Sequence, residues 1–211
     1  GGFSAASTTD FIQSIVMSIA LIIVVVFGVN AAGGVDVVMA NANALPGYLS
    51  LTAMYDAVSG TETKYGLITI VSTMAWGLGY FGMPHILLRF MAIEDEKKLP
   101  MARRVGSIWV VISMAVAIFI GVVGYSVSKV GAVSMLAGSA SETIIVELAN
   151  LLSKNGLLFA CMAGIILAGI LASIMSTADS QLLAAASSVS ENLVFEAFKI
   201  NISAKKKLLV A

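Results

Sequence analysis

Four stretches of the chain combine a high apolar content with a complete lack of Asp, Glu, Lys and Arg. They cover residues 11–29, 65–88, 105–128 and 155–178, so each is 19 to 24 residues long. A helix of about 20 residues crosses the roughly 30 Å hydrocarbon layer of a bilayer. Lipid offers no partners to backbone amides and carbonyls, and a helix satisfies them internally. The pattern therefore predicts four membrane-spanning helices.

The sequence lacks the strand-like alternation that is typical of a membrane β-barrel. We therefore predict an all-α integral membrane protein in which residues 1–211 form part of one membrane domain. With flanking residues added, we expect the spans at about 5–29, 66–92, 104–128 and 156–190. The segments between and after them are predicted as two outer loops, an inner loop and a tail, at residues 30–65, 129–155, 93–103 and 196–211.

The overall composition supports this class and excludes others. Apolar residues make up 59% of the chain and charged residues 11%, whereas soluble globular domains have roughly 45–50% and 25%. The net charge is zero, which gives no indication of a nucleic-acid partner. Cys161 is the only cysteine, so an internal disulfide is excluded. The chain begins with Gly1 rather than Met, which predicts that it is a piece of a larger protein.

The distribution of basic residues predicts the orientation in the membrane. Nine of the 12 Lys and Arg residues lie between the second and third uncharged stretches or after the fourth. Segments rich in Lys and Arg stay in the cytoplasm. We therefore expect the N-terminus, the 93–103 loop and the C-terminal tail on the cytoplasmic side.

The two outer loops carry local signals of their own. Gly33-Gly34, Pro46-Gly47 and Ser59-Gly60 are typical of turns. The spacing of Ser139 and Glu142 resembles a capping box, which predicts a helix start at that point. A run of apolar residues then follows on one helical face, namely Ile144, Ile145, Leu148, Leu151 and Leu152. We predict an amphipathic helix across the outer mouth, acting either as a gate or as a peripheral cover.

The second span contains the string WGLGYFGMPH, residues 76–85, with three glycines and a proline. Such residues weaken a helix interior, and Pro84 lacks the amide that would normally bond the Tyr80 carbonyl. Interrupted spans mark substrate sites in transporters. Trp76, Tyr80 and Pro84 are four residues apart and are expected on one face, where aromatic rings could attract the ammonium of a small zwitterion. The alternative is a packing kink whose glycines allow close helix approach.

The fourth span ends in a cluster of hydroxyl side chains, formed by Ser173, Ser176, Thr177 and Ser180. Hydroxyls and backbone carbonyls are the oxygen ligands that a hard cation prefers. In apolar helices such hydroxyls also simply bond back to the preceding turn. Asp179 beside them, and Asp10 in the first span, are carboxylates at or near the bilayer and are therefore functional candidates. The alternative for both is an ordinary position in interfacial water.

Several strings in this order resemble the sodium/solute symporter family: GGFSAASTTDF, WGLGYFGMPHILLRFMA, Ala102-Arg103-Arg104 and ASIMSTADSQLL. The resemblance covers essentially the whole chain and is strongest to the proline-transporting members. It implies part of a five-plus-five inverted-repeat fold of the leucine-transporter type, in the cell membrane. On that basis the chain holds the last core helix of the first repeat and the first three of the second.

The resemblance also implies roles for individual residues. The solute-binding positions of the family fall on Trp76, Tyr80 and Pro84. The sodium ligands fall on the backbone carbonyl of Ser173 and the hydroxyls of two residues that follow it, Ser176 and Thr177. The remaining ligands would come from a helix outside this chain.

Asp10 matches an aspartate that the family uses near the inner exit for sodium. In members that move two sodium ions, the resemblance implies a second sodium site at Asp10, Asp179 and Ser180. One departure concerns the solute, because Met83 stands where proline-transporting members carry glutamine. L-proline is therefore the expected solute, with another amino acid or small organic solute as the alternative.

We expect a sodium-coupled symporter rather than an enzyme, with the small solute, the lipid bilayer and the remaining helices of the parent protein as partners and Na⁺ as the coupled ion. An intramembrane enzyme would need a nucleophile–base pair or a metal cluster, and one histidine and one cysteine in separate spans provide neither. A channel or a structural membrane subunit remains as an alternative. The polar residues gather at two places rather than along a continuous stripe, which favours the carrier.

Overall fold

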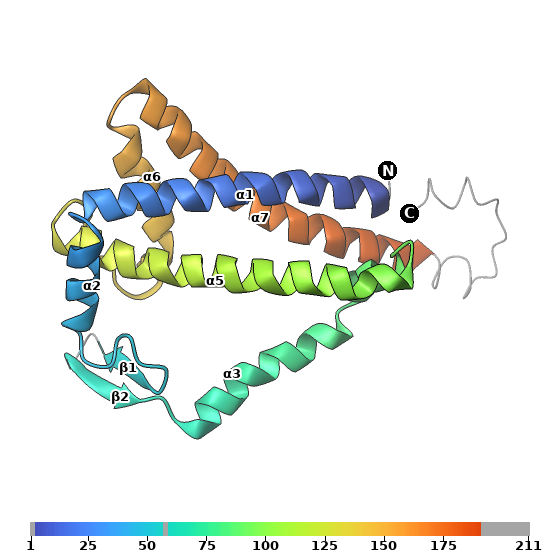
Figure 1. Ribbon diagram of the computed structural model, residues 1–211, viewed down its shortest axis with the longest axis horizontal. Helices are drawn as coiled ribbons and strands as arrows, with labels where there is room; N and C mark the ends of the chain where they lie inside the picture. Colours follow the sequence, from blue (N-terminus) through green and yellow to red (C-terminus); the bar gives the residue numbers. More distant parts are fainter. Residues whose placement is uncertain (1–2, 57–58, 191–211) are drawn as a thin grey trace.

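The computed structural model describes residues 3–56 and 59–190 and is mostly helical. Its three long helices are α1 (Phe3–Ala31), α5 (Leu99–Lys129) and α7 (Leu157–Ser188). In Figure 1, α1 and α5 lie side by side, and α7 crosses behind α1 in the opposite direction. The predicted helical membrane architecture is therefore confirmed. The predicted tail at 196–211 lies outside the described residues.

Length and composition allow three single helices of the described part to cross a membrane, and a fourth span if a bent pair is counted as one. The bent pair consists of α3 (Leu67–Gly79) with the 3-10 turn η1 (Tyr80–Gly82), followed by α4 (Pro84–Met91). The two parts meet at an angle of 54°. A short 3-10 helix, η2 (Glu96–Lys98), then leads into α5.

The segment between α1 and α3 contains more regular structure than the sequence analysis predicted. It forms a helix, α2 (Val35–Asn43), and two antiparallel strands, β1 (Ala53–Asp56) and β2 (Thr61–Lys64). The all-α expectation is therefore wrong for this loop. The turn before β2 was anticipated, and Gly60 has a φ of 69° there. The strands were missed because each is only four residues long and β2 is exposed throughout, so they leave no run of alternating apolar residues.

The segment between α5 and α7 forms a 3-10 helix, η3 (Gly138–Thr143), and then α6 (Ile144–Ser153). The predicted capping box is wrong, because the α-helix begins at Ile144 and no side chain caps its N-terminus. The predicted apolar face is confirmed. Leu148 and Leu152 are fully buried, and the other three residues of that face pack against the core.

The core lies where α1, α5, α6 and α7 meet, away from the chain's N-terminus. Val24, Val123 and Ile166 are almost completely buried there, together with Leu148. Membrane helices associate through close packing of small residues rather than through exclusion of water. This part of the chain therefore forms a closely packed bundle.

The outer loop is also tied to this bundle. The ring of Tyr48 lies against that of Tyr125 in α5, with centroids 6.0 Å apart. Burial, and to a smaller extent the neighbouring Tyr125 phenol, raises the pKa of Tyr48.

The two ends of the bundle are composed of different segments. The beginning of α1, the region from α4 to the start of α5, and the end of α7 gather at one end in Figure 1, whereas α2 and the hairpin lie at the other. The first end contains the segments that the charge distribution predicts to be cytoplasmic. The orientation itself stays a prediction.

Candidate functional site

The predicted interruption of the second span is present. The α-helix gives way to a 3-10 turn at Tyr80, and Met83 has extended backbone with φ −81° and ψ 117°. Pro84 then occupies the first turn of α4, where its missing amide removes no helical hydrogen bond. The proline therefore begins a new helix rather than kinking a continuous one.

One detail of the interruption differs from the prediction. The carbonyl of Tyr80 is not left free, because it accepts a hydrogen bond of 3.3 Å from the amide of Met83. The tighter 3-10 turn brings the amide three residues ahead into reach and replaces the bond that Pro84 cannot make. The interruption therefore leaves no free carbonyl at Tyr80.

The glycines of the interruption do not serve close helix packing within the described chain. A Cβ atom added at Gly77, Gly79 or Gly82 would meet nothing within 4 Å. Each of these glycines still weakens the helix by about 1 kcal/mol relative to alanine. In this part of the chain their observable effect is therefore on the backbone, which is consistent with a deliberate break.

The three predicted solute-binding residues, Trp76, Tyr80 and Pro84, do not lie on one face of a continuous helix, because the helix bends between Tyr80 and Pro84. Trp76 and Tyr80 precede the bend and expose 74% and 49% of their surface. Pro84 follows the bend and lines a cleft of about 430 Å³, which Gln181 and Ala184 of α7 line from the other side. The break therefore directs α4 toward α7, while α3 buries none of its residues in the described chain.

The hydroxyl cluster of α7 gathers three oxygen atoms around one turn. The backbone carbonyl of Ser173 accepts hydrogen bonds from Ser176 Oγ at 3.1 Å and from Thr177 Oγ1 at 3.5 Å. Such back-bonding alone is common in apolar helices. It nevertheless brings together the one carbonyl and two hydroxyls that the resemblance implies as sodium ligands. Ser173 and Thr177 are exposed in the described chain, so further ligands can approach them.

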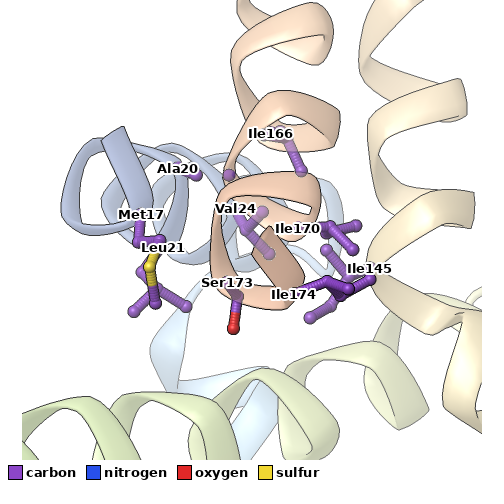
Figure 2. Close-up of a pocket in the computed structure, with 10 residues that line it drawn as sticks. Met17, Ala20, Leu21, Val24, Ile145, Ile166, Ile170, Ser173 and Ile174 are labelled. Atoms are coloured by element: carbon purple, nitrogen blue, oxygen red, sulfur yellow. The ribbon is translucent and has the colours of Figure 1, made fainter. Parts of the chain in front are cut away.

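The cluster lies at the edge of an apolar cleft of about 280 Å³ between α1, α6 and α7 (Figure 2). Met17, Leu21 and Ile170 are among its lining residues, and Ser173 supplies the one hydroxyl among them. In Figure 2 the Ser173 oxygen points away from the isoleucines that line the cleft. The oxygen cluster therefore borders on apolar surface that other helices could cover.

A second polar cluster joins three helices near the N-terminus of α1. Asp10 Oδ2 accepts a hydrogen bond of 2.5 Å from Arg89 Nη2, and the same nitrogen donates to Ser180 Oγ at 2.6 Å. Ser180 in turn donates to the carbonyl of Ser176 at 2.9 Å. Asp10 and Ser180 are thus brought together as predicted, but through an arginine. Asp179 forms no hydrogen bond or ion pair with any residue that the structure describes.

Sequence reasoning missed Arg89 of this cluster and also Gln13, which lies three residues after Asp10 on α1. Arg89 was counted only as a basic residue of the inner side, although it lies one turn after His85 in an otherwise apolar helix. Gln13 was not considered, although an amide in the first span is expensive without a partner. Both are polar residues within predicted spans, and that signal alone could have marked them.

These features define the chain as a multi-pass helical membrane protein with an interrupted span beside a hydroxyl-bearing helix. The family model of the sodium:solute symporter family matches residues 1–211. The chain therefore belongs to this family, which confirms the resemblance seen in its motifs. The named relatives are transporters rather than enzymes.

Curated relatives include two proteins of Bacillus subtilis (strain 168). The chain is 35% identical to the osmoregulated proline transporter OpuE over 210 residues, which is 100% of the chain and 39% of that protein. It is 36% identical to the high-affinity proline transporter PutP over 206 residues, or 98% of the chain and 40% of that protein.

A third relative is the sodium/proline symporter 2 of Staphylococcus saprophyticus, 36% identical over 192 residues, or 91% of the chain and 34% of that protein. The chain thus spans about two fifths or less of the length of these relatives. No solved structure matches it.

Proposed function

We propose that the protein to which this chain belongs is a symporter that couples sodium entry to the uptake of L-proline across the cell membrane. One observation carries the proposal: similarity to proline transporters extends over the whole chain, and so through both the broken span and the hydroxyl cluster. The parent protein would complete a five-plus-five inverted-repeat fold with helices outside this chain. Both ends of the chain would face the cytoplasm.

The solute site is proposed at the broken span. The rings of Trp76 and Tyr80 are exposed and can cover the apolar ring of proline while attracting its ammonium group. Pro84 would set the direction of the segment that follows. Met83, beside it, is the position most suited to altering solute preference, and another small amino acid is the alternative solute.

The sodium site is proposed on α7. The Ser173 carbonyl and the hydroxyls of Ser176 and Thr177 would coordinate sodium. These contacts would replace the two hydrogen bonds that the hydroxyls donate to the carbonyl in this structure. A small hard cation prefers about five or six oxygen ligands, so two or three more would come from a helix of the parent protein. Sodium is here the transported ion, and it would bridge that helix and α7.

The coupling follows from this bridging. Sodium shifts the equilibrium between outward-open and inward-open states only if it binds one of them more tightly. The driving energy is adequate, at about 2.3 kcal/mol per charge for each 100 mV of membrane potential and about 1.4 kcal/mol for a tenfold sodium gradient. Asp10, together with Asp179 and Ser180, is proposed to lie beside the inner path by which sodium leaves.

The test is uptake of labelled proline by vesicles that contain the full-length protein, with and without a sodium gradient. Ser176→Ala and Thr177→Ala should each raise the sodium concentration for half-maximal uptake by about tenfold, the effect of roughly one lost ligand interaction. Ser113→Ala is the matched control, because Ser113 makes the same type of back-bond on α5. Unchanged sodium dependence in both α7 variants would refute the ion site.

The same assay tests the solute site. Trp76→Ala should raise the apparent proline constant much more than the sodium constant, since the indole would contact only the solute. Trp109→Ala, on α5, removes the other tryptophan of the chain and serves as control. Equal effects on the two constants would refute the assignment. A channel would conduct sodium without proline, and a structural subunit would show no uptake.

A further inference from the structure

One guanidinium group joins three helices at the end of the bundle where α1 begins. Arg89 extends from α4 and donates from Nη2 to Asp10 of α1 and to Ser180 of α7. The Asp10 side chain is only 13% exposed, whereas that of Arg89 is 47% exposed. The cation therefore reaches from a more open position to a largely enclosed carboxylate.

The arginine also fills the space around this carboxylate. The cavity bounded by Asp10, His85, Arg89 and Ser180 leaves only about 10 Å³ of free volume. A single water molecule needs about 10–15 Å³ on this measure. A sodium ion with any of its own water therefore does not fit while the guanidinium is present.

Two oxygen acceptors on α1 nevertheless remain without a partner among the described residues. Asp10 Oδ1 and Gln13 Oε1 are buried and have no hydrogen-bond partner in the described chain. They are three residues apart on α1 and so lie on the same face of that helix. Asp10 and Ser180 line the cavity, and Gln13 lies about one turn further along α1. The four oxygen atoms of these three side chains, which include a negative charge, have the chemistry that a hard cation prefers.

We propose that Arg89 is a built-in cation that takes the place of a second sodium ion between Asp10 and Ser180. One carboxylate is neutralised by one guanidinium, and a sodium ion added there would face that positive charge at close range. The protein would then couple uptake to one sodium ion, bound on α7. This inference rests on the proposed symport and concerns its ion stoichiometry.

The primary experiment measures sodium dependence and sodium-to-proline flux ratio in vesicles with the full-length protein. The original protein should give a Hill coefficient for sodium of about one, and Arg89→Met should raise it toward about two by opening a second site. Arg89→Lys keeps the charge and should stay near one. Arg104→Met removes an arginine that is exposed on α5 and serves as control.

The dependence on Asp10 makes the test specific. Adding Asp10→Asn to Arg89→Met should abolish the binding of the second sodium ion and return the Hill coefficient to about one, because the carboxylate is lost. The proposal is overturned if the original protein already moves two sodium ions per proline, or if Arg89→Met transports with a single ion.

A second measurement decides the matter when Arg89→Met does not transport. Thermal unfolding of the purified full-length protein is followed against sodium, with choline as the control ion. Arg89→Met should show a larger sodium-dependent rise in Tm than the original protein, which binds sodium only on α7, and Asp10→Asn should remove the difference. No such gain overturns the inference. Failure of the symport proposal is a separate result, seen as proline uptake by the original protein that does not respond to sodium.

Discussion

The packed bundle and the broken span differ in how much of their surface this chain covers by itself. In the bundle, α6 buries Leu148 and Leu152 against its neighbours. In the broken span, neither α3 nor α4 has a fully buried residue. Since membrane helices are held together by close contact, the bundle is the self-sufficient part. The rings of Trp76 and Tyr80 in the broken span stay exposed in this chain.

Glycine illustrates the same difference at the level of single atoms. In the bundle, a Cβ at Gly28 would lie 2.6 Å from Val123 Cγ1, and one at Gly169 would lie 2.6 Å from Ala20 Cβ. In the broken span, a Cβ at Gly79 would meet nothing within 4 Å. The same residue type thus permits close packing in one region and weakens the helix in the other.

The largest loss of stability is expected from a substitution at the centre of the bundle. Leu148→Ala should lower the free energy of unfolding of the full-length protein by about 2–5 kcal/mol, because it leaves a cavity in a closely packed site. Leu78→Ala, on α3, removes a side chain that is 73% exposed in this chain. It should therefore lower the free energy of unfolding by a smaller amount. Thermal unfolding in detergent measures both, and equal losses would contradict the distinction between the regions.

An intermediate effect is expected at the crossing of α1 and α7. Gly169→Ala should lower the free energy of unfolding by about 1–3 kcal/mol, because the new methyl group would overlap with Ala20, whose Cβ cannot rotate away. Gly164→Ala is the matched control on the same helix, since its Cβ would meet nothing within 4 Å. If both variants unfold alike, the close crossing is not what determines stability there.

The smallest change in stability is expected at the break. Gly79→Ala should raise the free energy of unfolding by up to about 1 kcal/mol, the difference in helix propensity between the two residues. If the break serves transport, the proline uptake rate should fall at the same time. Stability is read from thermal unfolding and uptake from vesicles. A loss of stability like that of Gly169→Ala would mean that helices of the parent protein pack closely on Gly79.

The broken span was predictable only in part from residues close together in the sequence. Pro84 has no backbone N–H in any fold, so the interruption could be predicted from the residue type. The way in which Tyr80 recovered a partner could not, because it depended on the exact turn that formed. The hairpin of β1 and β2 was missed for a related reason, since its four-residue strands are defined by their pairing with each other rather than by their own sequence.

The amino-acid order was enough to predict helical spans, the apolar face of α6 and the site of the break, because each depends on residues close together along the chain. The contact of Arg89 with Asp10 depends on folding, because 79 positions separate the two residues and three helices must meet to join them. A long apolar run must become a helix in lipid, whereas the partner of a polar side chain is set by whichever helix packs beside it.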